Sequence, residues 1–485
     1  MKLNELLADL TYDCAADTEG LEITGVAYDS RKVVDGSLFV CLRGEKADGH
    51  DFIPQAVQAG AAALVVEEMP KEPVAAVVIC VSDSREALAH ISAAWFGYPA
   101  RRMTMIGVTG TKGKTTTTHM IKKILEEADH KVGMIGTIGA YIADRKLPVK
   151  NTTPESYELH WLFSEMLKEG CDHVVMEVSS QGLKQKRTEG IRFDYAAFLN
   201  ISPDHIGAGE HADFEEYMAC KKMLFSQADK TVVNIDAEHW SEITADAASR
   251  ITVSTAQDAD FCGNEIEKLW EPGLLGTTFV LSGKAQGRIN LNMPGRFNVE
   301  NALTAIAVTT DIGIEMSCIA KALAEVSVKG RTQVLREVSH FSTFLIDYAH
   351  NALSMESLLQ TLKEYEPKRL ICLFGGGGNK PKQRRYDMGL VAGKYAELTV
   401  LTMDNPRYES MESINADIIR GLDVYGGRYL VIDDREEAIH YLLDNCDRGD
   451  MVALIGKGHE EYQEVNGVKI PFSEAEVVAR YLETK

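Results

Sequence analysis

The sequence predicts an α/β protein in which parallel β-sheets, covered by helices on both faces, form three consecutive domains. Its 485 residues exceed the roughly 100–200 residues of a single domain. Short apolar runs alternate with amphipathic helical segments along most of the chain, which is typical of parallel sheets. A glycine-rich turn between one such run and a helix also fits this class, because it resembles a strand–loop–helix phosphate site.

We expect the domains to span residues 1–98, 99–328 and 329–485, with Tyr98-Pro99 in the first linker. Residues 251–293 alternate over short runs separated by glycine turns, which favours antiparallel strands appended to the central domain. A helix is expected from about residue 115 to residue 128. The segments expected as strands are 60–66, 74–82, 103–109, 131–138, 173–178, 195–201, 231–235, 343–347, 369–374, 398–402, 429–432 and 451–455.

Charge and composition exclude several functional classes. Lys and Arg total 51 against 72 Asp and Glu, and the net charge of −21 argues against broad binding to nucleic acid or to acidic membranes. No apolar run reaches the roughly 18 residues of a membrane span, and the first residues lack the apolar core of a secretory signal. The nine cysteines form no CxxC pair, so we expect no disulfide framework and a location in the reducing cytoplasm.

The strongest local signal is the run TGTKGKTT at residues 109–116, between an apolar strand and a helix. Glycines let backbone N–H groups approach phosphate oxygens, a lysine reaches the β- and γ-phosphates, and a threonine hydroxyl suits Mg²⁺. The run departs from the pattern GxxxxGKS/T, because Val108 stands where the first glycine would be. The loop alone does not separate a GTPase, a kinase, an ATPase and a ligase. The residues expected to bind ATP here are Gly110, Thr111, Lys112, Gly113, Lys114, Thr115 and Thr116.

Nine motifs in the same order make the chain similar to the Mur ligases. They are TGTKGKTT, TTPES, MEVSSQGL, ISPDH, PGRFNVENALTA, GRTQVL, DYAHN, DNPR and GKGHEEYQ, and an amino-terminal DSR block extends the resemblance over almost the whole chain. The resemblance implies a UDP-sugar-binding domain, a central ATP-binding domain and a carboxy-terminal Rossmann-like domain. It also implies ATP and Mg²⁺ as cofactors and an amide-forming reaction through an acyl phosphate.

Among these ligases, the chain most resembles those that add the third amino acid in peptidoglycan precursor synthesis. The implied substrates are UDP-N-acetylmuramoyl-L-alanyl-D-glutamate and meso-2,6-diaminopimelate, and we expect a monomer that binds no nucleic acid. L-lysine or another diamino acid remains an alternative acceptor. A folylpolyglutamate-type ligase would share the phosphate loop, and a non-catalytic nucleotide-binding paralogue would belong to another class. A G protein would need a guanine-reading NKxD motif, which does not follow the loop.

By resemblance, the catalytic residues are Lys114, Glu177, His205 and Lys221. Those implied to bind Mg²⁺ are Thr115, Glu177, His205 and Lys221. Lys221 matches the lysine that reacts with carbon dioxide to form N6-carboxylysine, which requires a neutral amine and therefore partial burial. Lys222 is its neighbour, and without the family context both would be read as solvated helix lysines. Glu177 would equally be read as a solvated acid at a strand end.

Three further sets of residues follow from the resemblance. The muramoyl-peptide set is Ser30, Glu45, Lys46, Ala47, Thr152, Thr153, Ser179, Gln185 and Arg187. The remaining nucleotide contacts are Asn298, Asn301, Arg331 and Asp347. The amino-acid set is Arg385, Asp404, Asn405, Pro406, Arg407, Gly456 and Glu460.

Arg407 is the residue expected to select the added amino acid. Diaminopimelate differs from lysine by a distal carboxylate, which a guanidinium binds through two parallel hydrogen bonds and which lysine lacks. Read without the family, Arg407 is a surface arginine in a turn. The sequence departs from the usual family pattern near the substrate and acceptor sites, at Gln181, Asn351, Asn379 and Lys380.

Overall fold

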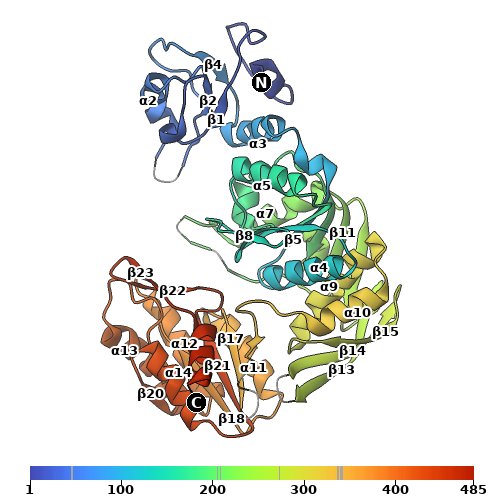
Figure 1. Ribbon diagram of the computed structural model, residues 1–485, viewed down its shortest axis with the longest axis vertical. Helices are drawn as coiled ribbons and strands as arrows, with labels where there is room; N and C mark the ends of the chain where they lie inside the picture. Colours follow the sequence, from blue (N-terminus) through green and yellow to red (C-terminus); the bar gives the residue numbers. More distant parts are fainter. Residues whose placement is uncertain are drawn as a thin grey trace. The chain divides into compact units, whose positions relative to one another are not determined.

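The computed structural model describes residues 1–44, 47–204, 206–207, 209–271, 274–335, 338 and 342–484. They form two compact units, one of Met1–Cys262 with Leu303–Ile319 and one of Gly263–Ala302 with Ala320–Lys485 (Figure 1). The domain boundaries expected near residues 98 and 328 do not coincide with these units and stay a prediction. None of the described helices has both the length and the apolar character needed to cross a bilayer.

The amino-terminal part of the first unit is a four-stranded parallel sheet whose strands follow one another in chain order. Apolar side chains from alternate strand positions form a separate core on each face of this sheet. The elements are α1 (Leu3–Leu6), β1 (Gly25–Ala27), β2 (Ser37–Val40), α2 (Ile53–Gln58), β3 (Ala63–Val66), β4 (Val77–Cys80) and α3 (Ser84–Trp95).

The central sheet of the first unit is parallel from β12 to β6 and ends in two antiparallel strands, β7 and β8. Its strands, in spatial order, are β12 (Arg250–Ser254), β11 (Ala228–Asn234), β10 (Phe193–Phe198), β5 (Thr104–Thr109), β9 (His173–Glu177), β6 (Val132–Gly136), β7 (Gly139–Ile142) and β8 (Arg145–Leu147). The predicted strands of this region are confirmed to within about three residues at each end.

Helices cover both faces of the central sheet. The chain moves from β5 to β6 through α4 (Lys114–Glu127) and returns to β9 through α5 (Ser156–Lys168). Because these right-handed crossovers run in opposite directions, the two helices lie on opposite faces. Figure 1 shows α5 and α7 (Phe214–Ser226) on one side of the strands and α4 on the other. Two short helices, α6 (Ser180–Lys184) and α8 (Trp240–Ile243), complete the connections.

The expectation of antiparallel strands over residues 251–293 is wrong at its start. β12 pairs in parallel with β11, and β13 (Phe261–Glu271) begins in parallel beside β12. The reason is that α8 lies between β11 and β12, and such a crossover lets the chain return in the same direction. Antiparallel pairing joins β14 (Leu274–Gly283) and β15 (Gly287–Leu291), as expected.

The second unit contains a sheet with five parallel strands and one antiparallel edge strand, β16. In spatial order the strands are β16 (Gln333–Val334), β17 (Thr343–Asp347), β21 (Asp450–Ile455), β18 (Arg369–Phe374), β19 (Leu398–Leu401) and β20 (Tyr429–Val431). The strands predicted at 343–347 and 369–374 are confirmed, and the other three agree to within one residue. A two-stranded hairpin, β22 (Tyr462–Val465) and β23 (Val468–Pro471), follows β21.

Alternate residues of these buried strands face two different cores. Leu370, Cys372 and Phe374 of β18 pack with one set of helices, whereas Ile371 and Leu373 pack with the other. The first set comprises α11 (Ala352–Lys363), α12 (Lys382–Tyr395) and α13 (Met411–Leu422), and the second α14 (Arg435–Asn445) and α15 (Glu474–Glu483). Two further helices, α9 (Arg296–Ile312) and α10 (Met316–Glu325), contribute residues to both units. Burial on both faces explains why these strands read as continuous apolar runs.

Among the residues that the structure describes in this unit, Arg435 and Glu474 form an ion pair whose two side chains are both buried. Arg435 of α14 donates from Nε and Nη2 to Glu474 Oε1 of α15, at 3.0 and 2.7 Å. The same guanidinium also donates to the carbonyl oxygen of Ile455 at 2.9 Å, so it joins both helices to the end of β21.

We expect Arg435→Gln to lower the unfolding free energy of this unit by about 3–5 kcal/mol, because it leaves the Glu474 carboxylate buried without its partner. Hydrogen exchange at the β17 and β21 amides measures this change. The matched control is Arg480→Gln, which breaks the exposed pair between Arg480 and Glu436 and should cost about 1 kcal/mol or less. Equal losses in the two variants would contradict the assignment.

Candidate functional site

The phosphate loop connects the end of β5 to the start of α4. Gly113 occupies the position before the first helical residue with φ of +87°, a conformation that favours glycine. Thr115 and Thr116 are buried in the first turn of α4. The N–H groups of this first turn lack partners within the helix, so the turn offers donors and a positive dipole end to phosphate.

Two side chains that the sequence did not single out hold this loop. Asn200, just after β10, accepts a hydrogen bond from the Lys112 amide at 2.9 Å and donates to the Lys112 carbonyl at 3.2 Å. The hydroxyls of Thr111 and Tyr217 lie 2.9 Å apart. The sequence indicates both residues only weakly: Asn200 directly precedes the ISPDH motif, and Tyr217 lies one helical turn before Lys221.

Lys114 and Lys221 meet at one backbone carbonyl. Lys114 Nζ donates to the Gly110 oxygen at 2.7 Å and to the Thr111 oxygen at 3.1 Å. Lys221 Nζ donates to the same Gly110 oxygen at 3.0 Å, although it comes from α7. The structure therefore brings together two of the four residues predicted to be catalytic.

Burial distinguishes Lys221 from its neighbour. The Lys221 side chain is 1% exposed, and burial, with the nearby charge of Lys114, holds its pKa well below the usual lysine value. Lys222 points elsewhere, is 37% exposed and forms an ion pair with Asp246 at 3.1 Å. A lysine needs a neutral amine to react with carbon dioxide, and only Lys221 of this pair has an environment that favours one.

Glu177 ends β9 beside the phosphate loop, and its side chain is 1% exposed. Its Oε1 accepts hydrogen bonds from the Thr115 hydroxyl and the Thr137 amide, each at 2.9 Å. Its Oε2 accepts from the Thr137 hydroxyl at 3.1 Å. A larger residue than glycine at position 136 would collide with this carboxylate, since its Cβ would lie 2.2 Å from Glu177 Oε1.

These oxygens suit Mg²⁺. A carboxylate and a hydroxyl are hard donors, and the 2.9 Å between Thr115 Oγ1 and Glu177 Oε1 places both at one point beside the phosphate loop. The sequence did not single out Thr137, which orients the carboxylate. Predicted residues His205, Glu45 and Lys46 lie outside the described residues.

The residues expected to contact the muramoyl peptide fall in two places. Near Glu177, Thr153 donates from Oγ1 to the Glu177 carbonyl and accepts from the Ser179 amide, both at 2.9 Å. Arg187 donates to the Thr153 carbonyl at 2.8 Å and to Gln185 Oε1 at 2.5 Å. The Thr152 hydroxyl lies 2.9 Å from that of Thr137.

Two other members of this set lie outside the strands, in the amino-terminal part of the first unit. Ser30 donates to Gln55 Oε1 at 3.1 Å, and Ala47 is exposed and accepts from the Gly44 amide at 3.0 Å. Their role in holding the nucleotide sugar stays a prediction.

In the second unit, the expected nucleotide contacts come from three places: α9 carries Asn298 and Asn301, the segment before β16 carries Arg331, and β17 ends in Asp347. Asp347 ends β17 and accepts from the amides of Thr332 at 2.7 Å and Ala349 at 2.8 Å, while burial raises its pKa. The Arg331 guanidinium lies 4.7 Å from the centre of the Tyr348 ring. Asn301 Nδ2 donates to Asn298 Oδ1 at 3.2 Å, and Asn298 Nδ2 donates to the Pro294 carbonyl at 2.8 Å.

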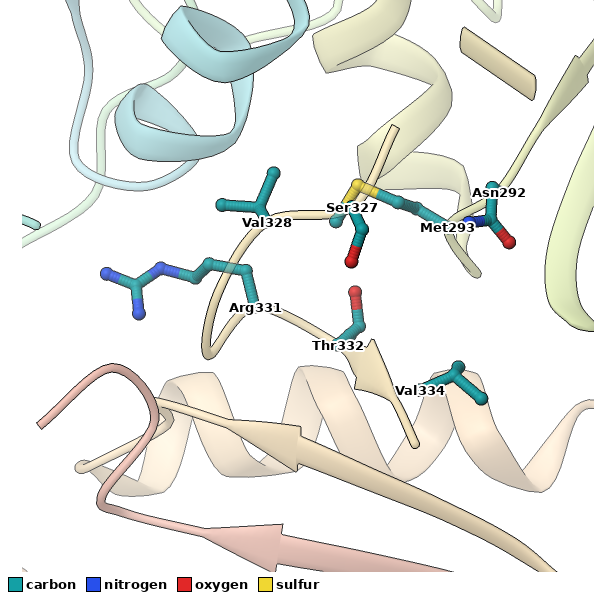
Figure 2. Close-up of a pocket in the computed structure, with 7 residues that line it drawn as sticks. All are labelled: Asn292, Met293, Ser327, Val328, Arg331, Thr332 and Val334. Atoms are coloured by element: carbon teal, nitrogen blue, oxygen red, sulfur yellow. The ribbon is translucent and has the colours of Figure 1, made fainter. Parts of the chain in front are cut away.

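A small pocket adjoins Arg331. Figure 2 shows the hydroxyls of Ser327 and Thr332 facing each other inside it, while Arg331 extends away from them. The lining residues are Asn292, Met293, Ser327, Val328, Arg331, Thr332 and Val334. The pocket is polar and narrow, and it lies at the chain segment that leads into β16.

The expected amino-acid site gathers at the carboxyl ends of β19 and β21. Lys457 Nζ is fully buried and donates to Asn405 Oδ1 at 2.9 Å and to Glu460 Oε2 at 3.1 Å. Asn405 donates to the same Glu460 oxygen at 3.0 Å, and Asp404 lies 3.5 Å from the lysine. Lys457 is part of the GKGHEEYQ motif but was not predicted as a site residue.

Arg407 stands beside this cluster with its backbone in the left-handed region, at φ of +52°. It donates from Nη1 to the Gly378 carbonyl at 2.7 Å and from Nε to Glu464 Oε2 at 3.1 Å. Its Nη2 has no hydrogen-bond partner among the described residues, so one side of the guanidinium remains available to an acid. Pro406 approaches the glycine-rich loop so closely that a Cβ on Gly378 would lie 1.8 Å from its carbonyl oxygen.

Arg385, which is expected to contact the added amino acid, is buried and forms ion pairs within the protein. Its guanidinium is 2% exposed and is paired with Glu409 at 2.8 Å and with Asp417 at 3.2 Å. It also donates to the Gly377 carbonyl at 3.0 Å, so it braces the glycine-rich loop. Contact between Arg385 and the amino acid stays a prediction.

Two of the departures have a local explanation. Asn351 caps α11 by accepting from the Ser354 amide at 2.9 Å, and asparagine and threonine are both good helix caps. Asn379 has φ of +55°, which asparagine tolerates better than most residues. Gln181 donates weakly to the Gly209 carbonyl at 3.5 Å, and Lys380 is exposed.

Comparison with known proteins agrees with this geometry. Residues 22–96, 108–309 and 330–458 match families described as Mur ligase family, catalytic domain; Mur ligase middle domain; and Mur ligase, glutamate ligase domain. The chain is 40% identical over 485 residues to the UDP-N-acetylmuramoyl-L-alanyl-D-glutamate--2,6-diaminopimelate ligase of Caldanaerobacter subterraneus subsp. tengcongensis, covering 99% of each. It is 39% identical to the enzyme of the same name from Geobacillus thermodenitrificans, covering 98% of each.

Solved structures show the same fold. The structure of a UDP-N-acetylmuramoyl-L-alanyl-D-glutamate--2,6-diaminopimelate ligase has a TM-score of 0.74 at 28% identity and covers 100% of this chain and 99% of its own. MurF ligase from Thermotoga maritima in complex with ADP has a TM-score of 0.62 at 17% identity, covering 96% and 98%. The three family models and the two relatives that are 39–40% identical over nearly the full length show that the chain belongs to the Mur ligase family.

Proposed function

We propose that this protein is an ATP-dependent ligase that joins meso-2,6-diaminopimelate to UDP-N-acetylmuramoyl-L-alanyl-D-glutamate. The observation that supports this most is the meeting of Lys114 and Lys221 at the phosphate loop, beside the Glu177 carboxylate. The two relatives above carry the name of this reaction and are about 40% identical over nearly the full chain.

In the first step, the terminal carboxylate of the substrate attacks the γ-phosphorus of ATP. An O–P bond forms, the bond between the γ-phosphorus and the bridging oxygen breaks, and ADP leaves. In the second step, the acceptor amine attacks the acyl carbon of this acyl phosphate, loses a proton and displaces inorganic phosphate. The first step brings two anions together and the second releases a phosphate anion, so cations in the site lower both barriers.

The phosphate loop and Lys114 bind and orient the phosphates in this scheme. Lys114 Nζ donates to two carbonyl oxygens of the loop, and in this scheme that ammonium and the N–H groups of α4 would bind the phosphate oxygens. Thr115 and Glu177 would hold Mg²⁺, which when bound neutralises phosphate charge. Thr137 keeps the Glu177 carboxylate in position through two hydrogen bonds.

Lys221 has the surroundings of a carbamate-forming lysine. Its neutral amine would attack carbon dioxide, form an N–C bond and release a proton, which turns an uncharged amine into a carbamate anion with two oxygen donors. The hydrogen bond to the Gly110 carbonyl holds the nitrogen at the phosphate loop. That position suits a carbamate oxygen that binds a second Mg²⁺.

Recognition of the acceptor would involve both ends of diaminopimelate. Arg407 would offer the distal carboxylate its Nη2, for which the described part of the chain supplies no hydrogen-bond partner, while its Nη1 donates to the Gly378 carbonyl. Glu460 and Asp404 supply carboxylates near the buried Lys457, at a place suited to the ammonium group of an amino acid. L-lysine lacks the distal carboxylate, so it would leave the guanidinium without this partner.

We expect Lys221→Ala to lower the rate of ADP formation with both substrates by roughly 100-fold or more, as loss of a preorganised charged group typically does. Lys222→Ala is the matched control, because Lys222 is exposed and paired with Asp246, and it should keep the rate within about twofold of the wild-type value. Release of ADP coupled to the new amide is measured, with each substrate omitted in turn. Equal rates in the two variants would argue against the proposed role.

We also expect protein equilibrated with ¹³C-bicarbonate to show a carbamate carbon resonance that is absent from Lys221→Ala and present in Lys222→Ala. The physical reason is that the carbamate forms only on an uncharged amine, and burial favours that form at Lys221. A spectrum without the resonance in the wild-type protein would rule out the modification while leaving the ligase reaction open.

Arg407→Ala should reduce kcat/KM for diaminopimelate by about 10- to 100-fold, corresponding to roughly 1.4–2.8 kcal/mol for a lost charge-assisted hydrogen bond. Arg420→Ala, which removes an exposed arginine of the same unit, should have no effect. A panel of diaminopimelate, L-lysine and other diamino acids measures the specificity. If the wild-type protein uses L-lysine and rejects diaminopimelate, the proposed acceptor is wrong and the ligase class is retained.

A further inference from the structure

A cluster of two histidines and one aspartate lies at the amino end of the central sheet. His130 stands between α4 and β6, while Asp172 precedes β9 and His173 begins it. The two strands are neighbours, and Val132 of β6 is in register with His173 of β9. The turn that carries His130 is therefore held next to the turn that carries Asp172.

The donor atoms of the three side chains converge. His130 Nδ1 lies 2.7 Å from Asp172 Oδ2, and His173 Nδ1 lies 3.0 Å from Asp172 Oδ1. The two imidazole rings are 4.5 Å apart between centroids and cross at 70°. One donor atom from each residue lies within 4.8 Å of the other two.

We propose that His130, Asp172 and His173 bind a divalent transition-metal ion of the zinc class. Zinc takes imidazole nitrogen at about 2.0–2.1 Å and carboxylate oxygen at about 2.0–2.2 Å, which places tetrahedral ligand atoms about 3.3 Å apart. The His–Asp separations of 2.7 and 3.0 Å are those of hydrogen bonds, and small side-chain rotations would open them to that spacing. Imidazole ligands favour zinc, nickel or copper over magnesium.

Exposure leaves room for the rest of the coordination shell. The side chains of His130 and Asp172 are 31% and 51% exposed, so water can reach the ion, whereas His173 is 8% exposed and is held by the sheet. One fixed ligand and two that adjust to the metal are a practical arrangement for a site on the protein surface.

This site is separate from the phosphate loop. His173 and Glu177 are the first and last residues of β9, so they lie at opposite ends of this strand, about 13 Å apart at 3.3 Å per residue. A bound ion would connect the end of α4, the helix that begins at the phosphate loop, to the start of the strand that ends in Glu177. Binding of the ion to the folded chain alone would stabilise it.

The test uses the full chain without a histidine tag, in an excess of Mg²⁺ that occupies hard oxygen sites. Zn²⁺ is titrated in a calorimeter, and Co²⁺ is titrated while its visible absorption reports nitrogen ligands. His130→Gln removes a half-buried ligand with little risk to the fold, and His173→Gln provides a second variant. The control is His239→Gln, which removes an exposed histidine of the same unit outside the cluster.

We expect the wild-type protein and the His239 variant to bind one Zn²⁺ with equal affinity and to give the same Co²⁺ spectrum. Each cluster variant should weaken Zn²⁺ binding by on the order of tenfold or more and lose that spectrum. Thermal unfolding should shift upward with Zn²⁺ in the wild-type protein and not in the cluster variants. Binding that is equal in the wild-type protein and in His130→Gln, or no binding in either, would overturn the proposal.

Discussion

The site depends on the burial of Lys221 against the backbone of the phosphate loop. An ammonium group is stable in such a place only when it is compensated, and here the main partner is the Gly110 carbonyl, which Lys114 also uses. Burial and the adjacent positive charge therefore favour the neutral amine. The same burial therefore disfavours a charged Lys221 in the folded chain and favours the neutral amine that carbamate formation would need.

The parallel sheets explain where the remaining residues lie. In open α/β sheets, ligands bind beyond the carboxyl ends of the strands. The phosphate loop and Glu177 lie there in the first unit, and Asp347, Asp404 and Lys457 lie there in the second. Each of these residues ends a strand that is buried on both faces or follows its end within three residues, which holds its backbone in place.

Hydrogen bonds from neighbouring residues hold the predicted site residues and their loops in fixed positions. Thr137 orients Glu177, Asn200 holds the loop at Lys112, and Arg385 braces the glycine-rich loop opposite Arg407. None of the three forms part of a recognisable phosphate or metal motif, because each acts through a contact that is distant in sequence. Glycines at 136 and 378 have a similar role, since a side chain at either position would collide with an oxygen atom.

The linear pattern of residues was sufficient for the fold class, most strands and the phosphate loop, since apolar periodicity and glycine spacing act over a few residues. It also located Lys221 and Glu177 through a family resemblance. The pattern misjudged the direction of β12, because α8 is too short to register as a crossover in the sequence. Folding alone separated Lys221 from Lys222, turned Arg385 inward and brought His130 to Asp172, since each outcome depends on burial or on contacts between residues far apart in the chain.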